Sequence, residues 1–276
     1  MIVAHEFFDA LPIHAFQSVP PSEPSNAPTR AGSPPRPSTV PQWRELVVSP
    51  APPPSTLSIS SVPPPQTAQP NIPEFQLSLA RASNPNSLVL PETSPRYKAL
   101  KSTSGAVIEI SPESQSYTEE LARRIGGTEA GADASGAALI LDYGPSDTIP
   151  VNSLRGIRAH QTCSPFAAPG QVDLSADVDF MALADAALRA SPNVEVHGPV
   201  EQGTFLQTMG IRERAEQLLK STGAKEREKK ERIASGWDRL VERGGGGMGR
   251  IYKAMAIVPL TGGKRRPVGF GGTVTG

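Results

Sequence analysis

The sequence predicts an α/β fold in which helices cover a sheet that contains parallel strands. Two observations carry this prediction. Candidate strands and helices alternate from about residue 97 to residue 260. In addition, the segment AALILDYG, residues 137–144, is apolar at successive positions rather than at alternate ones. Continuous apolarity is typical of a strand that is covered on both faces, as in a parallel sheet.

The first 17 residues are expected to form a strand, a loop and a short helix. The apolar run Ile2–Ala4 is the strand candidate, and polar side chains follow it at His5, Glu6 and Asp9. In sheets of this class, ligands collect at the carboxyl ends of the strands. These side chains therefore stand where a functional site is expected.

Proline is distributed unevenly, since 20 of the 30 prolines lie in Pro20–Pro95. Two segments of this region, 18–41 and 49–73, are rich in serine and proline and carry few large apolar side chains. Such segments cannot bury enough surface to offset the entropy that ordering costs. We therefore expect residues 18–96 to be a mostly disordered insertion with a short strand near 43–48.

Three proline runs in this insertion, at 34–37, 52–54 and 63–65, resemble ligands of polyproline-binding domains. A polyproline-binding partner is one interpretation. The alternative is a solvated insertion in a surface loop, which is the commoner role of such runs.

Local signals predict the elements that follow residue 97. Pro112 opens a helix with apolar side chains at helical spacing, and Gly126–Gly127 ends it. Gly210 is expected to divide a pair of helices in residues 201–221. Another helix is expected at 173–190, capped by Ser175 or Asp177, and a charged helix ends before the four glycines at 244–247. Strands are expected at 105–111, 194–198 and 251–260, and a flexible tail at 263–276.

Composition excludes several classes of protein. Positive and negative side chains balance at 27 each, so the charge of the whole chain gives no argument for nucleic-acid binding. The one cysteine excludes an internal disulfide framework and a cysteine-based metal cluster, and no metal site is expected. No apolar run approaches the length of a membrane span, and no targeting peptide is visible.

Six sequence blocks carry a family resemblance. In chain order they are EFFDALPIH, GAALILDYG, LRGIRAH, PGQVDLSADVDF, EQGTFLQTMGIRER and MGRIYKAMAIV. Together they resemble the MidA-like S-adenosylmethionine-dependent methyltransferases, a family that includes a mitochondrial arginine methyltransferase required for assembly of respiratory complex I. In this resemblance residues 1–17 start the methyltransferase core and residues 97–262 form its remainder.

The resemblance implies a Rossmann-like class I methyltransferase sheet and S-adenosyl-L-methionine as the cofactor. It also implies transfer of methyl groups to an arginine of a complex I subunit, giving symmetric dimethylarginine, in the mitochondrial matrix.

The chain departs from the family pattern at its start. The family carries a glycine-rich cofactor loop and its first strands upstream of EFFDALP, and this sequence has no such segment there. The run GGGGMG, residues 244–249, follows a predicted helix and precedes a predicted strand, which is the reverse of the order a cofactor loop requires. We therefore expect a sheet that lacks its first strands, as in the carboxyl-terminal part of a longer enzyme.

Glu6 and Asp9 are the first candidates for catalysis. A guanidinium group keeps its proton near neutral pH, so an arginine methyltransferase must hold a planar cation and help to remove a proton. Carboxylates do both, and they bind guanidinium best as forked acceptors. The resemblance places Glu6 on the acidic loop that follows the equivalent strand. The alternative for both acids is the start of a helix, where negative charge is favourable.

Other candidates follow from position. Asp142 and Tyr143 end the strand at 137–144 and are expected to contact the cofactor, with a capped turn as the alternative. His160 is the candidate proton acceptor, because the ordinary pKa of histidine lies near neutrality, although a surface role is commoner. Substrate contacts are expected from Phe7, His14 and Gln202.

Two functions remain open at the level of sequence. One is a protein-arginine methyltransferase, which rests on the six ordered blocks. The other is a catalytically inactive fragment or non-catalytic assembly protein, which rests on the absent cofactor loop.

Overall fold

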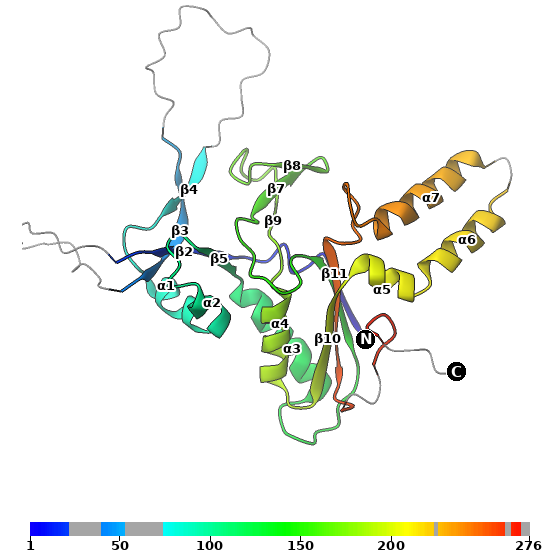
Figure 1. Cartoon of the computed structure of the whole chain (residues 1–276), viewed down its shortest axis with the longest axis horizontal. Coiled ribbons are helices and arrows are strands. Elements are labelled where there is room, and N and C mark those ends of the chain that lie inside the picture. The colour runs from blue at the N-terminus through cyan, green and yellow to red at the C-terminus, as the bar shows by residue number, and fades with distance from the viewer. Residues whose placement is uncertain (22–39, 53–73, 224–225, 263–265, 272–276) are drawn as a thin grey trace, which may run out of the picture. The chain divides into compact units, whose positions relative to one another are not determined.

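The computed structural model of the chain describes residues 1–21, 40–52, 74–223, 226–262 and 266–271 (Figure 1). The chain divides into two compact units. The first unit consists of Met1–Pro12, Ser111–Pro150 and Asp177–Gly276, and the second of Ile13–Ile110 and Val151–Ala176. Residues 97–110 and 151–176, which the resemblance assigns to the methyltransferase core, belong to the second compact unit, and their assignment to that core stays a prediction.

The first unit is built on a sheet with the strand order β1–β6–β11–β10. The strands span Ile2–His5 (β1), Ala138–Tyr143 (β6), Val194–Glu201 (β10) and Tyr252–Pro259 (β11). β1 is parallel to β6, whereas β11 is antiparallel to β6 and to β10. The strands predicted at 137–144, 194–198 and 251–260 are thus present, in a mixed sheet.

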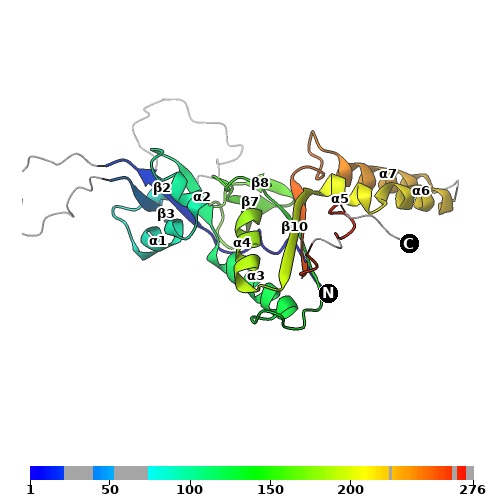
Figure 2. The same cartoon turned by 60° about the horizontal axis from the view of Figure 1, so that its bottom comes forward.

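Two helices, α3 (Pro112–Gly126) and α4 (Phe180–Ala190), lie side by side in both views and cover one face of this sheet (Figures 1 and 2). The Ser111 side chain caps α3 by accepting a hydrogen bond from Ser114 N–H, and Gly127 ends it with a φ of +70°. The apolar core between helices and sheet contains Phe8, Ala122, Ile125, Ile140, Val178, Phe180, Leu183, Met255 and Ile257.

Helix α4 begins later than its sequence suggests. The predicted start near Asp173, with Ser175 or Asp177 as the cap, is wrong: the helix begins at Phe180 and Asp179 caps it, accepting from Ala182 N–H at 3.1 Å. Residues Asp173–Ser175 instead form strand β9, which pairs with β7 (Arg155–Arg158). Backbone pairing across the chain therefore overrides the local cap signal.

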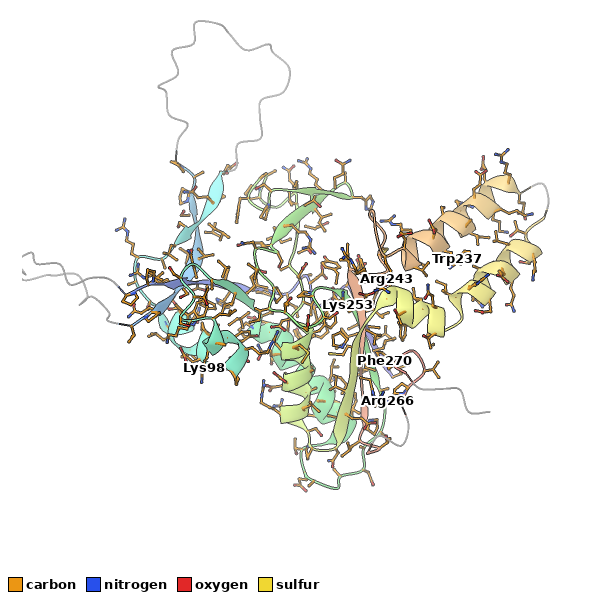
Figure 3. The ribbon with its side chains drawn as sticks, viewed as in Figure 1. Lys98, Trp237, Arg243, Lys253, Arg266 and Phe270 are labelled. Atoms are coloured by element: carbon orange, nitrogen blue, oxygen red, sulfur yellow. The ribbon has the colours of Figure 1, made fainter. Side chains whose placement is uncertain are left out.

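The opposite face of the sheet is covered by helix α5 (Gln202–Thr208) and by Phe270, whose ring centroid lies 5.3 Å from that of Phe205 (Figure 3). α6 (Ile211–Ser221) and α7 (Arg227–Val241) follow and lie side by side (Figure 2). Gly210, with a φ of +80°, separates α5 from α6 as predicted.

The second unit contains a sheet with the order β4–β3–β2–β5, in which every pair is antiparallel. A second, three-stranded sheet has the order β8–β7–β9. Three short helices, α1, η1 and α2, follow β4 in the chain. The bounds are His14–Val19 (β2), Gln42–Pro50 (β3), Phe75–Leu79 (β4), Pro85–Val89 (α1), Leu90–Glu92 (η1), Pro95–Ala99 (α2), Val107–Ile110 (β5), Arg155–Arg158 (β7) and Gln161–Cys163 (β8).

Several predictions for residues 1–96 differ from the structure. A strand, β2, stands where the short helix before Gln17 is predicted, because its backbone pairs with β3 and β5. Residues 74–96, expected to be part of a mostly disordered insertion, form β4, α1 and η1 and the start of α2. Asn84 caps α1 through a reciprocal pair of hydrogen bonds with Ser87, which is a local signal that composition hides.

Parts of the predicted insertion and tail lie outside the described residues, namely 22–39, 53–73, 263–265 and 272–276. The proline runs also lie there, apart from Pro52. In the described part of the tail, Phe270 is buried, with 9% of its surface exposed. Within the described part of the chain, no helix is both long and apolar enough to cross a bilayer.

Candidate active site

The carboxyl ends of β1 and β6 lie side by side. The two strands are parallel, with His5 opposite Leu141 in the register. The residue after β1 is Glu6, whose backbone N–H donates to the carbonyl of Leu141 at 3.0 Å. Glu6 and Asp142 therefore meet at one end of the sheet, which is where ligands gather in α/β folds.

Asp142 holds the loop that follows β1. Its Oδ2 atom accepts hydrogen bonds from the backbone N–H groups of Phe8 at 2.9 Å, Phe7 at 3.2 Å and Asp9 at 3.4 Å. Its Oδ1 atom accepts from Tyr143 N–H at 2.9 Å. The side chain is fully buried. This geometry assigns Asp142 to orienting the loop, and its predicted contact with a cofactor stays a prediction.

The surroundings of Asp142 have opposing effects on the pKa of its carboxyl. Burial and the neighbouring charge of Asp9 raise the pKa of the carboxyl, whereas the backbone N–H donors lower it. Burial dominates, and the pKa is raised to about 7. The group that orients the loop therefore titrates near neutrality.

This titration predicts a pH dependence of stability. The Asp142 carboxyl has a pKa of about 7 in the folded chain and an ordinary value of 3.8, so its protonated form favours folding. The contribution is complete below about pH 3.8 and is lost as the pH rises from there through about 7. From pH 5 to pH 8 we expect the free energy of unfolding to fall by about 2–3 kcal/mol more in the wild type than in Asp142→Asn. Urea unfolding at both pH values measures this, and parallel changes in the two proteins would rule the titration out.

Asp9 carries an oxygen that no protein group satisfies among the described residues. The hydroxyl of Tyr143 donates a short hydrogen bond to Asp9 Oδ2. Asp9 Oδ1 is buried and has no hydrogen-bond partner. Because the residue is only 9% exposed, an orphaned carboxylate oxygen there is costly unless a ligand or solvent donor reaches it.

Glu6 is the accessible acid of this site, since its side chain is 46% exposed. Its backbone adopts a φ of +47°, the left-handed region that non-glycine residues rarely occupy. Such conformations persist where the surroundings hold them, and they cluster at functional sites. Tyr252 donates a hydrogen bond from its hydroxyl to Glu6 Oε1 at 3.1 Å, and His5 Nε2 lies 3.9 Å from the same atom.

The remaining predicted residues of the first unit lie nearby or serve the fold. Phe7 is 40% exposed and stacks edge-to-face on Tyr117 with ring centroids 5.2 Å apart. Both rings line a groove of about 370 Å³ along β1 and α3. Gln202 is buried, and its amide donates to the carbonyl of Leu240 at 3.1 Å, so the described contact is structural.

The two predicted histidines belong to the second unit. His14 lies on β2, where Nδ1 is 2.6 Å from Glu45 Oε1 on β3. His160 is exposed at the turn between β7 and β8 and has a φ of +61°. The structure brings Glu6, Asp9, Asp142 and Tyr143 together in the first unit, and the roles of His14 and His160 stay predictions.

The glycine-rich turn at 244–249 offers no cradle for a cofactor. It joins α7 to β11, as the sequence predicts. A Cβ atom on Gly249 would lie 2.2 Å from the carbonyl oxygen of Val241, and one on Gly247 would lie 2.2 Å from that of Glu242. Gly247 and Gly249 therefore lack room for a side chain, because the turn packs closely on the end of α7. The described residues contain no strand, glycine-rich turn and helix in the order that cradles a cofactor.

Tyr252 is the site residue that the sequence does not reveal. It stands in the block MGRIYKAMAIV but is 246 positions from Glu6. The only local signal is an aromatic residue at the start of the last strand. Its neighbour Lys253 is buried, and burial lowers the pKa of its amino group.

Comparison with known proteins identifies relatives. The family model described as "Putative S-adenosyl-L-methionine-dependent methyltransferase" matches residues 1–200. The Protein arginine methyltransferase NDUFAF7, mitochondrial, of Mus musculus is 31% identical over 259 residues, which cover 94% of this chain and 46% of the mouse protein. The Homo sapiens protein of the same name is 29% identical over 257 residues and is covered to 45%. The chain thus spans about half the length of these curated relatives.

A solved structure shares the fold. It is a COG1565 superfamily member from Burkholderia thailandensis bound to S-adenosyl-homocysteine, with a TM-score of 0.58 and 18% sequence identity. The similarity covers 93% of this chain and 52% of the bacterial one.

Proposed function

Because the chain belongs to the family of S-adenosyl-L-methionine-dependent methyltransferases whose model matches its residues 1–200, we propose that it acts in methyl transfer to protein arginine. One observation carries the proposal: Glu6 and Asp9 stand on a loop that Asp142 orients by three backbone hydrogen bonds. The sheet with helices on both faces supports a Rossmann-like class I methyltransferase fold.

The two carboxylates suit a guanidinium group. Arginine stays protonated near neutral pH and presents its N–H donors in a planar fork. Glu6 is accessible and binds one side of that fork, because carboxylates accept such donors in pairs. Asp9 Oδ1 lacks a partner within the described structure and accepts a further N–H.

The protein's part in the reaction is to bind, orient and accept a proton. S-adenosyl-L-methionine supplies a methyl group on a sulfonium, and the described residues do not form its cradle. Methylation of a guanidinium nitrogen would release a proton, and a carboxylate of this loop would receive it. The charge of Glu6 also holds the substrate cation during the transfer.

The finer function follows the relatives. The NDUFAF7 proteins are named protein arginine methyltransferases and mitochondrial. We propose the same substrate class and compartment for this protein, with symmetric dimethylarginine in a subunit of respiratory complex I as the product.

Replacement of Glu6 by glutamine tests the proposal. Glu6→Gln keeps the shape of the side chain and removes its charge, so we expect the rate of methyl transfer to fall about 100-fold. Transfer of a labelled methyl group from S-adenosyl-L-methionine to an arginine peptide measures the rate. Glu120→Gln is the matched control, since Glu120 is an exposed acid on α3 that pairs with Arg124. Equal activity of the two variants would refute the role of Glu6.

The second candidate is a non-catalytic assembly or binding protein. Two observations favour it. The glycine-rich turn at 244–249 packs against the end of α7 and forms no cofactor cradle, and this chain covers about half the length of each relative. Calorimetric titration of the chain with S-adenosyl-L-methionine separates the two, because a protein that only binds partners releases no heat with the cofactor.

A further inference from the structure

We propose that Tyr252 is a positioning residue that holds the Glu6 carboxylate in the orientation that receives an arginine side chain. The inference rests on the proposed function and adds a residue from the last strand to the site. Its basis is the hydrogen bond from the Tyr252 hydroxyl to Glu6 Oε1 at 3.1 Å.

Tyr252 is itself held firmly. It is the first residue of β11 and stands opposite Tyr143 in the register. Its ring meets that of Tyr143 edge-to-face, with centroids 5.1 Å apart. The Tyr252 N–H donates to the carbonyl of Met248 at 3.1 Å. The neighbouring Lys253, labelled in Figure 3, donates from Nζ to the carbonyl of Ile251 at 3.1 Å, which secures the entry to the strand.

The hydroxyl of Tyr252 acts as a donor. Burial and the negative charge of Glu6 raise its pKa above the ordinary value of 10, so the proton stays on the oxygen near neutral pH. A neutral hydroxyl beside a carboxylate gives a charge-assisted hydrogen bond.

The side chain of Glu6 needs a hydrogen-bond donor to fix its orientation. Its backbone is fixed by the bond to Leu141, but its side chain is 46% exposed and flexible groups of this kind sample several rotamers. The Tyr252 hydroxyl occupies one lone pair of Oε1 and leaves Oε2 and the remaining lone pair of Oε1 for a guanidinium fork. Tyr252 therefore selects one rotamer without blocking the ligand.

Each of the two acids has a tyrosine as its hydrogen-bond donor. Tyr143 donates to Asp9, and Tyr252 donates to Glu6. Because the rings of Tyr143 and Tyr252 are in contact, the donor to Asp9 and the donor to Glu6 support each other. Asp142 fixes the backbone of the same loop.

The test is Tyr252→Phe, which keeps the ring and removes only the hydroxyl. The probes are a peptide with one central arginine and its counterpart with citrulline, the neutral analogue. The readout is the ratio of their affinities for the chain, measured by calorimetry. A loss of folded protein lowers both apparent affinities equally, so the ratio reports positioning alone.

We expect the wild type to prefer the arginine peptide, Glu6→Gln to lose the preference, and Tyr252→Phe to reduce it about tenfold. Glu120→Gln is the control and should leave the ratio unchanged, since Glu120 is an exposed acid on α3 that pairs with Arg124.

The outcomes separate the two proposals. A wild type without preference for arginine contradicts the proposed function. A wild type with that preference, lost in Glu6→Gln but unchanged in Tyr252→Phe, overturns only the role of Tyr252. A Tyr252→Phe variant that no longer melts cooperatively also overturns it, since the hydroxyl would then serve the fold.

Discussion

Replacing Asp142 by alanine is expected to lower the free energy of unfolding by about 4 kcal/mol. The substitution leaves four backbone N–H groups, those of Phe7, Phe8, Asp9 and Tyr143, without the acceptor they use. The Asp142 side chain is fully buried, so solvent replaces that acceptor poorly. Urea unfolding of the two proteins, followed by circular dichroism, measures the loss.

Asp142→Ala should also destabilise the loop after β1 locally, in addition to lowering the free energy of unfolding of the whole protein. Because the orphaned groups belong to the loop after β1, proteolysis of Asp142→Ala is expected to cut near Phe7 and Phe8 before other sites. Asp133→Ala is the control, since Asp133 is an exposed acid in the loop before β6. A stability of Asp142→Ala within about 1 kcal/mol of this control would show that the loop does not depend on Asp142.

Replacing Gly144 by alanine is expected to lower the free energy of unfolding by about 3 kcal/mol. A Cβ atom at this position would lie 2.3 Å from the carbonyl oxygen of Val178 and 2.8 Å from its nitrogen. Both contacts are with backbone, which cannot rotate away. Val178 N–H also donates to the carbonyl of Tyr143 at 3.0 Å, so the strain reaches the end of β6 and the entry to α4.

Gly236→Ala provides the matched control for Gly144→Ala. Gly236 lies in helix α7, and nothing stands within 4 Å of a Cβ atom built there. Alanine is a better helix former than glycine, so this variant is expected to gain about 0.5–1 kcal/mol. Thermal unfolding of both variants measures whether each substitution lowers or raises the stability. Two variants of equal stability would contradict the steric argument.

Elements with local signals could be predicted from the sequence. Helix α3 has a serine cap, a proline at its first position and a glycine at its end, and each acts within one turn. The break at Gly210 and strand β6 follow from equally local patterns. The position of Glu6 and Asp142 at neighbouring strand ends also follows, because parallel strands end together.

Elements that depend on distant pairing could not be predicted. The sequence predicts a short helix before Gln17 where β2 lies, and it includes 74–96 in a mostly disordered insertion, because composition alone does not show which backbone groups will find partners. Strand β9 replaced the start of a predicted helix for the same reason. For β2, β4 and β9 pairing across the chain outweighs the local propensity, whereas α1 depends on its local Asn84 cap.

The sequence by itself determined the family pattern, the alternating elements of the first unit and the acidic residues that follow β1 and β6. Only the tertiary structure decided how those acids are held. Asp142 bonds to a loop more than 130 positions away, and Tyr252 reaches Glu6 across 246 positions. Such contacts have no local signature, since their energy exists only after the sheet has brought the strand ends together.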